Sequence, residues 1–307
     1  METMQYLYAG RYDMSQLCQG ASSVRDEIDH HKEGMNVEYD RAYFKGKTAV
    51  VTGGASGIGL ALVEELLQSG AVKVMMADIN QAHLDEHESR LKAQYGGERV
   101  KGMLCNVTKE EDVQKLIAAA ADYFGGQFDL LFNNAGAGFD GWFEDMTNAD
   151  WKTAFDLNFY GALYGMRAAL PIMKKQGGGQ IVNIISGIAI TPMAHAARYA
   201  ATKAALNGLS LALRAEYWDD NIKISSATPG TTVTAIFGDT KPPDTAQSSH
   251  QSASRILNGV VDNVRIIYGD DGDVEAGKVC FHPNSQRAVD EHLISVTRAR
   301  REGKVAY

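Results

Sequence analysis

The chain alternates short apolar runs with longer segments in which apolar residues recur at helical spacing. The run TAVVTGG at residues 48–54 predicts a strand, and the segment GIGLALVEELLQSGA after it predicts an amphipathic helix closed by Gly70. Further strands are predicted at 72–77, 99–105, 128–133, 179–185 and 222–227, and further helices near 81–94, 109–124, 148–175, 197–219 and 251–264. Strands that alternate with amphipathic helices indicate βαβ units and hence a parallel sheet.

The predicted strands are nearly continuous in Val, Ile, Leu and Met, which is typical of strands covered by helices on both faces. The predicted fold class is therefore α/β, a doubly wound parallel sheet in three α/β/α layers. We expect a single domain at residues 45–265, with a polar loop at 231–252 beyond the last predicted strand. Residues 1–44 are interpreted as an N-terminal extension and residues 266–307 as a C-terminal extension.

The composition is that of a globular protein with a sizeable core, because 45% of the 307 residues are hydrophobic and 22% are charged. The net charge of -8 disfavours nucleic acid as a partner, since binding to phosphate backbones depends on clustered Lys and Arg. The one basic run, Arg298 to Arg301, is interpreted as a solvated helix end. No segment reaches the ~20 unbroken apolar residues of a membrane span, so no membrane partner is expected.

The three cysteines, Cys18, Cys105 and Cys280, are odd in number and far apart. This pattern fits neither a disulfide framework nor a metal site, so no metal is expected and a reducing compartment is the simplest interpretation. The first residues lack the apolar core of a secretory signal and are too acidic for a transit peptide. We therefore expect a cytoplasmic protein.

The glycine-rich stretch TGGASGIG, Thr52 to Gly59, falls between the first predicted strand and the first predicted helix. Glycines there let the backbone approach a pyrophosphate, while the helix N-terminus offers free N–H groups and a positive dipole end. An ordinary turn is the alternative, but a Rossmann-like dinucleotide site requires this position between strand and helix. The residues predicted to contact the cofactor here are Gly53, Ser56, Gly57, Ile58 and Gly59.

The second predicted strand ends at Asp78. A carboxylate at this place binds the 2′-hydroxyl of an adenosine ribose and repels a 2′-phosphate. Neither Ile79 nor the glycine-rich turn offers an Arg or Lys that would neutralise such a phosphate. The predicted cofactor is therefore NAD rather than NADP.

Two further segments place amide side chains near the predicted cofactor. The tetrapeptide NNAG, Asn133 to Gly136, ends the fourth strand, where the amides could fix the strand end and the glycine leave room for a cofactor; a plain turn is the alternative. Asn158 falls on the apolar stripe of its predicted helix. A buried amide without partners costs about 1–3 kcal/mol. Asn158 is therefore expected either to make a structural polar contact or to hold water and relay a proton.

The stretch ARYAATKAAL places Tyr199 and Lys203 one helical turn apart on the same face. A Tyr-x-x-x-Lys match alone is most often a pair of surface side chains. Here Ser186 ends the preceding strand, and a dinucleotide turn occurs earlier in the chain. The combination predicts that these three residues act together in catalysis.

With these motifs in this order, the sequence resembles the short-chain dehydrogenase/reductase family over residues 45–265. The resemblance implies a catalytic tetrad of Asn158, Ser186, Tyr199 and Lys203. Asn106 departs from the family, which usually has Asp there, so we expect altered adenine contact rather than lost binding. The cofactor contacts that the resemblance implies beyond the glycine-rich turn are Asp78, Ile79, Asn106, Val107, Asn134, Ala135, Gly136, Tyr199, Lys203, Pro229, Gly230, Thr232 and Thr234.

The mechanism that the resemblance implies is hydride transfer between a secondary alcohol and NAD, with Tyr199 as general base and acid. The Lys203 ammonium, with the nicotinamide ring, is expected to lower the pKa of Tyr199 from its reference value of about 10. Ser186 would hold the substrate oxygen, and Lys203 would also bind the nicotinamide ribose. Asn158 would keep a water that links Lys203 to solvent.

The segments beyond the strand ends predict the substrate pocket. Their residues are mostly apolar or aromatic, which favours a hydrophobic or aromatic secondary alcohol or its ketone over a phosphorylated substrate. His195 could instead be a solvated loop residue, and Met193 a packing residue. The predicted lining residues are Phe139, Trp142, Ile188, Met193, His195 and Phe237.

The helix around Tyr199 is rich in small residues, which allow another helix to approach closely. Family members pair this helix and the one carrying Asn158 across a two-fold axis, so the resemblance implies a homodimer or homotetramer. Three other interpretations stay open: a ketone reductase, an NAD-using epimerase or dehydratase, and a non-catalytic NAD-binding sensor. The intact Asn, Ser, Tyr and Lys set disfavours the sensor.

Overall fold

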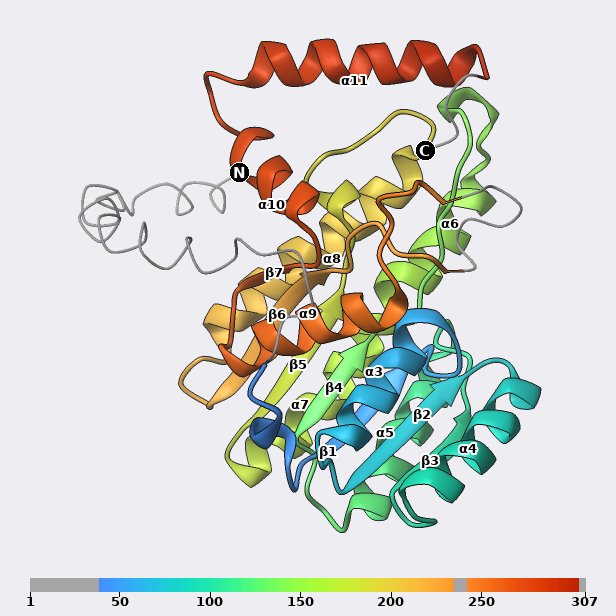
Figure 1. Ribbon diagram of the computed structural model, residues 1–307, viewed down its shortest axis with the longest axis vertical. Coiled ribbons are helices and arrows are strands. Elements are labelled where there is room, and N and C mark those ends of the chain that lie inside the picture. The colour runs from blue at the N-terminus through green and yellow to red at the C-terminus, as the bar shows by residue number, and fades with distance from the viewer. Residues whose placement is uncertain (1–38, 235–241, 304–307) are drawn as a thin grey trace, which may run out of the picture. The chain divides into compact units, whose positions relative to one another are not determined.

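The computed structural model describes residues 39–234 and 242–303, in which a twisted sheet lies between layers of helices (Figure 1). Phe237, a predicted substrate contact, lies outside the described residues. The strands are β1 (Thr48–Thr52), β2 (Lys73–Asp78), β3 (Val100–Leu104), β4 (Leu130–Asn133), β5 (Gly179–Ile184), β6 (Ile222–Thr228) and β7 (Ile266–Tyr268). The α-helices are α3 (Gly57–Gln68), α4 (Gln81–Tyr95), α5 (Glu110–Phe124), α6 (Asn148–Phe155), α7 (Gly161–Gln176), α8 (Ala197–Glu216), α9 (Ser249–Val261), α10 (Asp271–Val279) and α11 (Gln286–Arg301).

The sheet of the described residues is parallel and has the strand order β3-β2-β1-β4-β5-β6-β7. The order reverses between β1 and β4, which pair directly, with Val51 opposite Phe132. At such a switch point the loops after the two strands diverge and leave a crevice at the carboxyl edge of the sheet. The doubly wound α/β fold predicted from the sequence is confirmed, and its switch point lies at the glycine-rich turn.

Two apolar clusters cover the two faces of the sheet. Helices α3, α4 and α9 contribute to one cluster, and α5, α7 and α8 to the other. Neighbouring residues of β1 alternate between them, since Val51 belongs to the first cluster and Val50 to the second. Both side chains are fully buried, which explains why the strand is continuous in apolar residues.

The helix predicted at 148–175 is interrupted. It begins as α6 with a capping box between Thr147 and Asp150, passes through a π-helical segment at Asp156–Tyr160, and continues as α7. A Cβ at Gly161 would lie 3.0 Å from the Val107 side chain, so α7 starts in close contact with the loop after β3. Such single-turn π-helical segments are rare inside α-helices, and the apolar spacing of the sequence did not predict this one.

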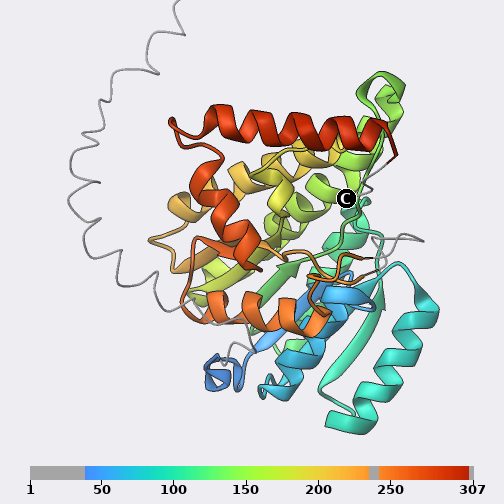
Figure 2. The ribbon, with the colours of Figure 1, turned by 45° about the horizontal axis from the view of Figure 1, so that its top comes forward.

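The sheet continues past the boundary expected at residue 265. Strand β7 pairs with β6, with Ile267 opposite Ala227. Its three residues are too few for a recognisable pattern in the sequence. Helices α10 and α11 follow, and α11 runs across one end of the molecule to the loop that leads into α6, as both views show (Figures 1 and 2). The ion pair between Arg301 of α11 and Glu144 of that loop confirms the proximity.

Candidate active site

The turn between β1 and α3 has the shape that its glycines permit. Gly53 and Gly57 have φ of 61° and 50°, in the left-handed region that side chains disfavour. A Cβ at Gly59 would lie 2.0 Å from the Gly53 carbonyl oxygen, so only glycine fits where α3 begins against the turn. Ser56 precedes α3 without making a side-chain cap hydrogen bond. No cap from this residue therefore competes with an anion for the first N–H groups of α3.

Asp78 ends β2 directly beside this turn. Its Oδ2 accepts a hydrogen bond from the Ala55 N–H at 3.1 Å, and its Oδ1 accepts one from the Asn80 N–H at 3.0 Å. The carboxylate is thereby fixed against the glycine-rich turn. Ile79, the next residue, is 67% exposed and presents no charge.

The strand end at Asn106 forms a local turn. Asn106 Oδ1 accepts hydrogen bonds from the N–H and the hydroxyl of Thr108, at 3.1 and 2.8 Å. Val107 is buried, and its side chain packs against the start of α7. The Asn106 side-chain oxygen thus closes this turn by accepting hydrogen bonds, as the carboxylate of an Asp at the same position also would.

The NNAG segment is tied to the glycine-rich turn. Asn134 Nδ2 donates to the carbonyl oxygens of Thr52 and Gly53, at 2.9 and 3.2 Å. The Thr52 hydroxyl accepts from the N–H groups of Asn134 and Ala135, at 3.0 and 3.1 Å. These bonds hold the end of β4 against the end of β1. Asn133, by contrast, is buried and donates to an asparagine of β5, so its role is to join two strands.

Asn158 lies in the π-helical segment and is 1% exposed. Its Oδ1 accepts from the Ala137 N–H, and its Nδ2 donates to the Ala137 carbonyl, both at 3.0 Å. The amide therefore pairs with the backbone just after Gly136. A Cβ at Gly136 would lie 2.9 Å from Asn158 Oδ1 and 3.2 Å from Lys203 Nζ. The two polar atoms consequently face one small space.

Ser186, Tyr199 and Lys203 lie together at the carboxyl edge of the sheet. The Ser186 hydroxyl accepts from the Ile188 N–H at 3.3 Å and hydrogen-bonds to the Tyr199 side chain. Lys203 Nζ lies 5.9 Å from the centre of the Tyr199 ring and donates to the Ile184 carbonyl at 2.8 Å. The structure thus brings the three residues into one cluster, as their spacing predicts.

Burial dominates the proton affinities of this cluster. The pKa of Tyr199 is raised, because burial penalises the phenolate more than the Ser186 hydrogen bond stabilises it, and Asp140 and Asp273 add to the rise. Burial also lowers the pKa of Lys203 to about 8. The lowering of the Tyr199 pKa that the sequence predicted is therefore not produced by the protein alone.

The loop after β6 reaches back to the glycine-rich turn. Gly230 has φ of 69°, and the Thr232 hydroxyl donates to the Pro229 carbonyl at 3.0 Å. A Cβ at Gly57 would lie 3.4 Å from the Thr234 methyl group. Thr234, one of the predicted cofactor contacts in this loop, therefore lies beside the turn between β1 and α3.

A comparison with known families assigns this geometry. A family model described as short chain dehydrogenase matches residues 47–244, a range that contains the glycine-rich turn, the NNAG segment and the Asn, Ser, Tyr and Lys cluster. The chain belongs to the short-chain dehydrogenase/reductase family.

The relatives of this short-chain dehydrogenase/reductase include users of both nicotinamide cofactors. An uncharacterized oxidoreductase of Staphylococcus aureus (strain MRSA252) is 38% identical over 200 residues, 64% of this chain and 83% of the relative. A 7α-hydroxysteroid dehydrogenase complexed with NADH and 7-oxo glycochenodeoxycholic acid has a TM-score of 0.69 and 26% identity, covering 75% of this chain and 94% of that chain. The L-sorbose reductase of Gluconobacter frateurii, complexed with NADPH and L-sorbose, has a TM-score of 0.68 and 27% identity, covering 75% and 97%.

The predicted substrate residues of this short-chain dehydrogenase/reductase lie in two adjoining loops. The rings of Trp142 and His195 are 4.9 Å apart, and the Arg301 guanidinium lies 4.1 Å from the centre of the Trp142 ring. Arg198 lies 5.3 Å from the centre of the Phe139 ring. The aromatic lining is thus accompanied by cations, one of them from α11, that the sequence analysis did not assign.

The other two predicted substrate residues have packing contacts. Ile188 is buried in a small cluster with Ala196 and Ala200, against which Tyr199 packs. The Met193 sulfur lies 3.9 Å from a guanidinium nitrogen of Arg300 in α11. Ile188 therefore lies nearer the predicted chemistry than Met193, which is held under α11.

Asp273, which no sequence motif indicated, lies on α10 and reaches this site. A Cβ at Gly187, the residue after Ser186, would lie 2.0 Å from Asp273 Oδ1. The Asp273 charge contributes to the raised pKa of Tyr199, and burial raises the pKa of Asp273 itself to about 6. In the sequence this residue belongs to the run GDDGD, which is also typical of an exposed helix start. Only the fold reveals its place.

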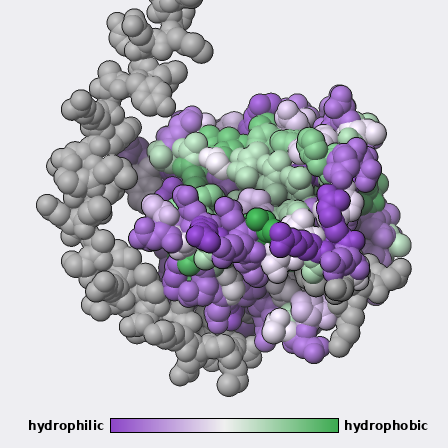
Figure 3. All heavy atoms as spheres, turned by 90° about the horizontal axis from the view of Figure 1, so that it is seen from above, coloured by the Kyte–Doolittle hydropathy of each residue, from purple (hydrophilic) through white to green (hydrophobic). Residues whose placement is uncertain are grey.

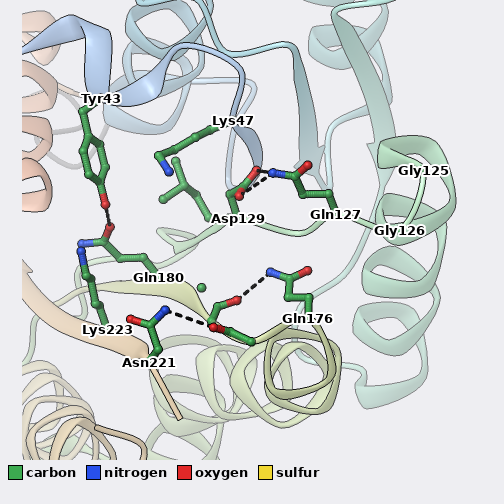
Figure 4. Close-up of a pocket in the computed structure, with 14 residues that line it drawn as sticks. Tyr43, Lys47, Gly125, Gly126, Gln127, Asp129, Gln176, Gln180, Asn221 and Lys223 are labelled. Carbon is green, nitrogen blue, oxygen red and sulfur yellow. Dashed lines mark hydrogen bonds between the residues drawn. The ribbon is translucent and has the colours of Figure 1, made fainter. Parts of the chain in front are cut away.

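A cavity of about 580 Å³ lies elsewhere, among loops that include the starts of β4 and β5 (Figure 4). The Tyr43 hydroxyl donates to Gln180 Oε1 at 2.8 Å beside this cavity. The lining includes Tyr43, Lys47, Gln127, Asp129, Gln176, Gln180, Asn221 and Lys223 and none of the predicted site residues. Because open α/β sheets bind their ligands beyond the carboxyl ends of the strands, this cavity is not part of the active site.

Among residues 39–234 and 242–303, no group of His, Cys, Asp and Glu side chains is arranged to hold a metal ion. Over those same ranges, no helix is long and apolar enough to cross a membrane.

Proposed function

We propose that the protein is an NAD-dependent oxidoreductase that interconverts a secondary alcohol and its ketone. The observation that carries the proposal is the cluster of Ser186, Tyr199 and Lys203 beside the crevice that the glycine-rich turn borders. A hydroxyl, a phenol and an ammonium next to a dinucleotide turn are the groups that proton transfer needs when a hydride moves to or from a carbinol carbon. Residues 45–265 would then form most of the NAD-binding and catalytic domain, to which β7 adds an edge strand and α10 adds Asp273.

The residues at the turn fit NAD. The uncapped N-terminus of α3 suits a pyrophosphate, and the left-handed glycines of the turn let the backbone come close to it. The fixed carboxylate of Asp78 suits an adenosine ribose and repels a 2′-phosphate, and Ile79 beside it supplies no cation. This supports NAD over NADP. When bound, NAD supplies the hydride chemistry and a positively charged nicotinamide ring.

In alcohol oxidation, Tyr199 would take the proton of the substrate hydroxyl while Ser186 donates a hydrogen bond to the same oxygen. Lys203 would stabilise the phenolate, and its pKa of about 8 lets it hold or release a proton near neutral pH. A water in the space beside Gly136 would join Lys203 Nζ to Asn158 Oδ1. In ketone reduction the same residues would return the proton.

We propose a hydrophobic or aromatic substrate. The rings of Phe139, Trp142 and His195 and the side chain of Ile188 support this, since they gather at the loops around Tyr199. Similar structures hold ligands of different kinds, since the 7α-hydroxysteroid dehydrogenase is complexed with 7-oxo glycochenodeoxycholic acid and the L-sorbose reductase with L-sorbose.

We also propose that the chain forms a homodimer or homotetramer through α7 and α8. The surface of α8 exposes Ala204, Gly208, Ala212 and Ala215, spaced so that another helix could approach closely. Figure 3 shows an apolar area bordered by polar side chains on the face that is seen from above. A light-scattering mass equal to one chain would reject this assembly. Cys105 and Cys280 are free thiols, which supports a reducing compartment such as the cytoplasm.

The test of the catalytic assignment is Tyr199→Phe. This change removes only the hydroxyl, so NADH formation from a panel of aromatic and aliphatic secondary alcohols should fall by at least ~1000-fold, because the proton acceptor is lost. NAD binding, measured by calorimetry, should stay within about twofold of the unmodified protein. Tyr95→Phe, a change on α4 at the other side of the sheet, is the control and should leave both quantities unchanged. Near-normal turnover in Tyr199→Phe would refute the assignment.

A further inference from the structure

We propose that Asp273 is a substrate-recognising residue, whose carboxylate accepts a hydrogen bond from a hydroxyl or amino group that the substrate carries next to its reacting carbon. The inference rests on the proposed oxidoreductase function and narrows its substrate class. It adds one anion to an aromatic and apolar lining whose other charged neighbours, Arg198 and Arg301, are cations.

The position of Asp273 is the first argument. A Cβ at Gly187 would lie 2.0 Å from Asp273 Oδ1 and 3.2 Å from Oδ2, so the missing side chain at Gly187 is what makes room for the carboxylate. Gly187 directly follows Ser186, which would hold the reacting oxygen. The field of Asp273 also reaches the Tyr199 hydroxyl. A substrate group within reach of Asp273 while the carbinol oxygen lies at Ser186 must therefore be close to the reacting carbon.

The hydrogen bonds of the carboxylate are the second argument. The Thr228 hydroxyl and the Gly230 N–H lie close enough to this carboxyl to lower its pKa. The Thr228 hydroxyl oxygen accepts from the Gly269 N–H at 3.2 Å, which leaves its own proton for Asp273. Asp273 Oδ2, however, is buried and has no hydrogen-bond partner. A buried carboxylate oxygen without a partner is unfavourable, so a donor supplied by a ligand would be bound strongly there.

The rigidity of α10 is the third argument. Asp270 caps this helix, since its Oδ1 accepts from the Asp273 N–H and its Oδ2 from the Thr231 N–H, both at 2.7 Å. Near the other end, the Cys280 thiol donates to the Ile190 carbonyl at 2.8 Å. The helix is thus tied to both loops that flank the site. A carboxylate held in this way can discriminate between substrates, because it does not move to accommodate the wrong one.

The charge balance is the fourth argument. The three arginines of the substrate side are engaged elsewhere: Arg198 with Asp150, Arg300 with the Ala194 carbonyl and Arg301 with Glu144. No cation contributes to the pKa of Asp273, which burial raises to about 6. The carboxylate therefore disfavours an anionic substrate and favours a hydroxyl or an ammonium group.

The test compares styrene glycol, an aromatic vicinal diol, with α-methylbenzyl alcohol, which lacks the second hydroxyl. Binding of each alcohol to the enzyme–NADH complex is followed by NADH fluorescence, so the measurement does not require turnover. We expect the unmodified protein to bind the diol at least ~10-fold more tightly, because a site built around a hydrogen bond rejects the analogue that lacks the donor. In Asp273→Asn the preference should fall to within about threefold, with the affinity for the monoalcohol unchanged.

A second variant and a control make the result specific. Gly187→Ala should also remove the preference, because the new Cβ collides with the carboxylate and displaces it. Asp271→Asn is the matched control on the same helix, where the carboxylate is exposed and pairs with Arg255. This control should keep the preference.

The outcomes separate the two proposals. If NADH binds but the unmodified protein shows no preference for the diol, or Asp273→Asn keeps the preference, the role of Asp273 is overturned while the oxidoreductase assignment stands. Equal losses for both alcohols in Asp273→Asn would show that the residue merely supports the loop, and would also overturn the inference. If NADH does not bind at all, the proposed function fails and the inference fails with it.

Discussion

The cofactor side and the substrate side of the crevice are built in different ways. On the cofactor side, the contacts join backbone atoms and short side chains at neighbouring strand ends, as where Asn134 bonds to Thr52 and Gly53. On the substrate side, they join the segment after β5 to helices that follow β7, as where Arg300 bonds to Ala194 and Asp273 lies against Gly187. The first arrangement requires the right small residues in the right place, and the second requires α10 and α11 to be docked. Cofactor binding and substrate choice should therefore be separable by mutation.

Gly59→Ala should have the largest effect, which is a loss of cofactor binding. The added Cβ would lie 2.0 Å from the Gly53 carbonyl oxygen, so α3 must shift away from the turn. We expect NAD affinity, measured by calorimetry, to fall roughly 100-fold or more, because the pyrophosphate site depends on that close approach. Gly97→Ala is the control, since a Cβ there meets nothing within 4 Å. A Gly59→Ala protein that binds NAD normally would show that the turn does not hold the cofactor.

The cofactor side could be predicted from the sequence because its requirements are local. Each motif lies at a strand end that the apolar pattern locates, and a parallel sheet brings those ends to one edge. The glycines of the turn are dictated by sterics that any sequence must respect, such as the left-handed φ of 61° at Gly53. The cluster of Ser186, Tyr199 and Lys203 follows from the same rule, since one residue ends a strand and two share a helix face.

The substrate side could be predicted only in part, because its contacts depend on helices that no strand-end motif places. Asp273 and Arg301 reach the site through helices after β7, and nothing in the local pattern says where those helices dock. The proton affinities were also beyond the sequence. Pairing with Lys203 suggested a lowered pKa for Tyr199, whereas burial of both groups, which depends on the packed fold, dominates the outcome.

Helix α8 borders both the cofactor side and the substrate side of the crevice. Lys203→Met tests how much the buried Lys203 ammonium of this helix destabilises the folded protein. The pKa of Lys203 falls from 10.5 to about 8 on burial, which corresponds to about 3 kcal/mol of destabilisation while the group is charged in both states. Loss of the hydrogen bond to Ile184 offsets about 1 kcal/mol of this. We expect Lys203→Met to be inactive but more stable than the unmodified protein by about 2 kcal/mol at neutral pH.

The pH dependence of unfolding tests whether the higher stability of Lys203→Met comes from removing a buried charge. Because the pKa of Lys203 is lower in the folded protein, the destabilisation is complete below pH about 8 and disappears as the pH approaches 10.5. Urea unfolding at neutral pH and near pH ~10 should therefore show the advantage of Lys203→Met shrinking. Lys115→Met, an exposed lysine on α5, should show no such trend. A variant that is less stable at neutral pH would mean that Lys203 contributes more by its contacts than burial costs.

Asp78→Asn should also change cofactor binding, but by less than Gly59→Ala does. The amide oxygen can still accept from the Ala55 or Asn80 N–H, so the turn should keep its shape. The negative charge is lost, however, and with it the repulsion of a 2′-phosphate. We expect the ratio of NAD to NADP affinity to fall about tenfold, measured by calorimetry with both cofactors. Asp85→Asn, whose carboxylate bonds to Gln81 on α4, should leave the ratio unchanged.

Arg301→Ala should have the smallest effect and act only on the substrate side. The guanidinium lies 4.1 Å from the centre of the Trp142 ring and pairs with Glu144, and all these contacts are near the surface. Exposed cation–π and ion pairs each contribute about 0.5–1 kcal/mol, so KM for the alcohol should rise about threefold while NAD affinity stays the same. Arg298→Ala, on the same helix and exposed, is the control and should change neither value. If Arg301→Ala weakened NAD binding as much as alcohol binding, α11 would serve both sides of the crevice, and the proposed separation between them would fail.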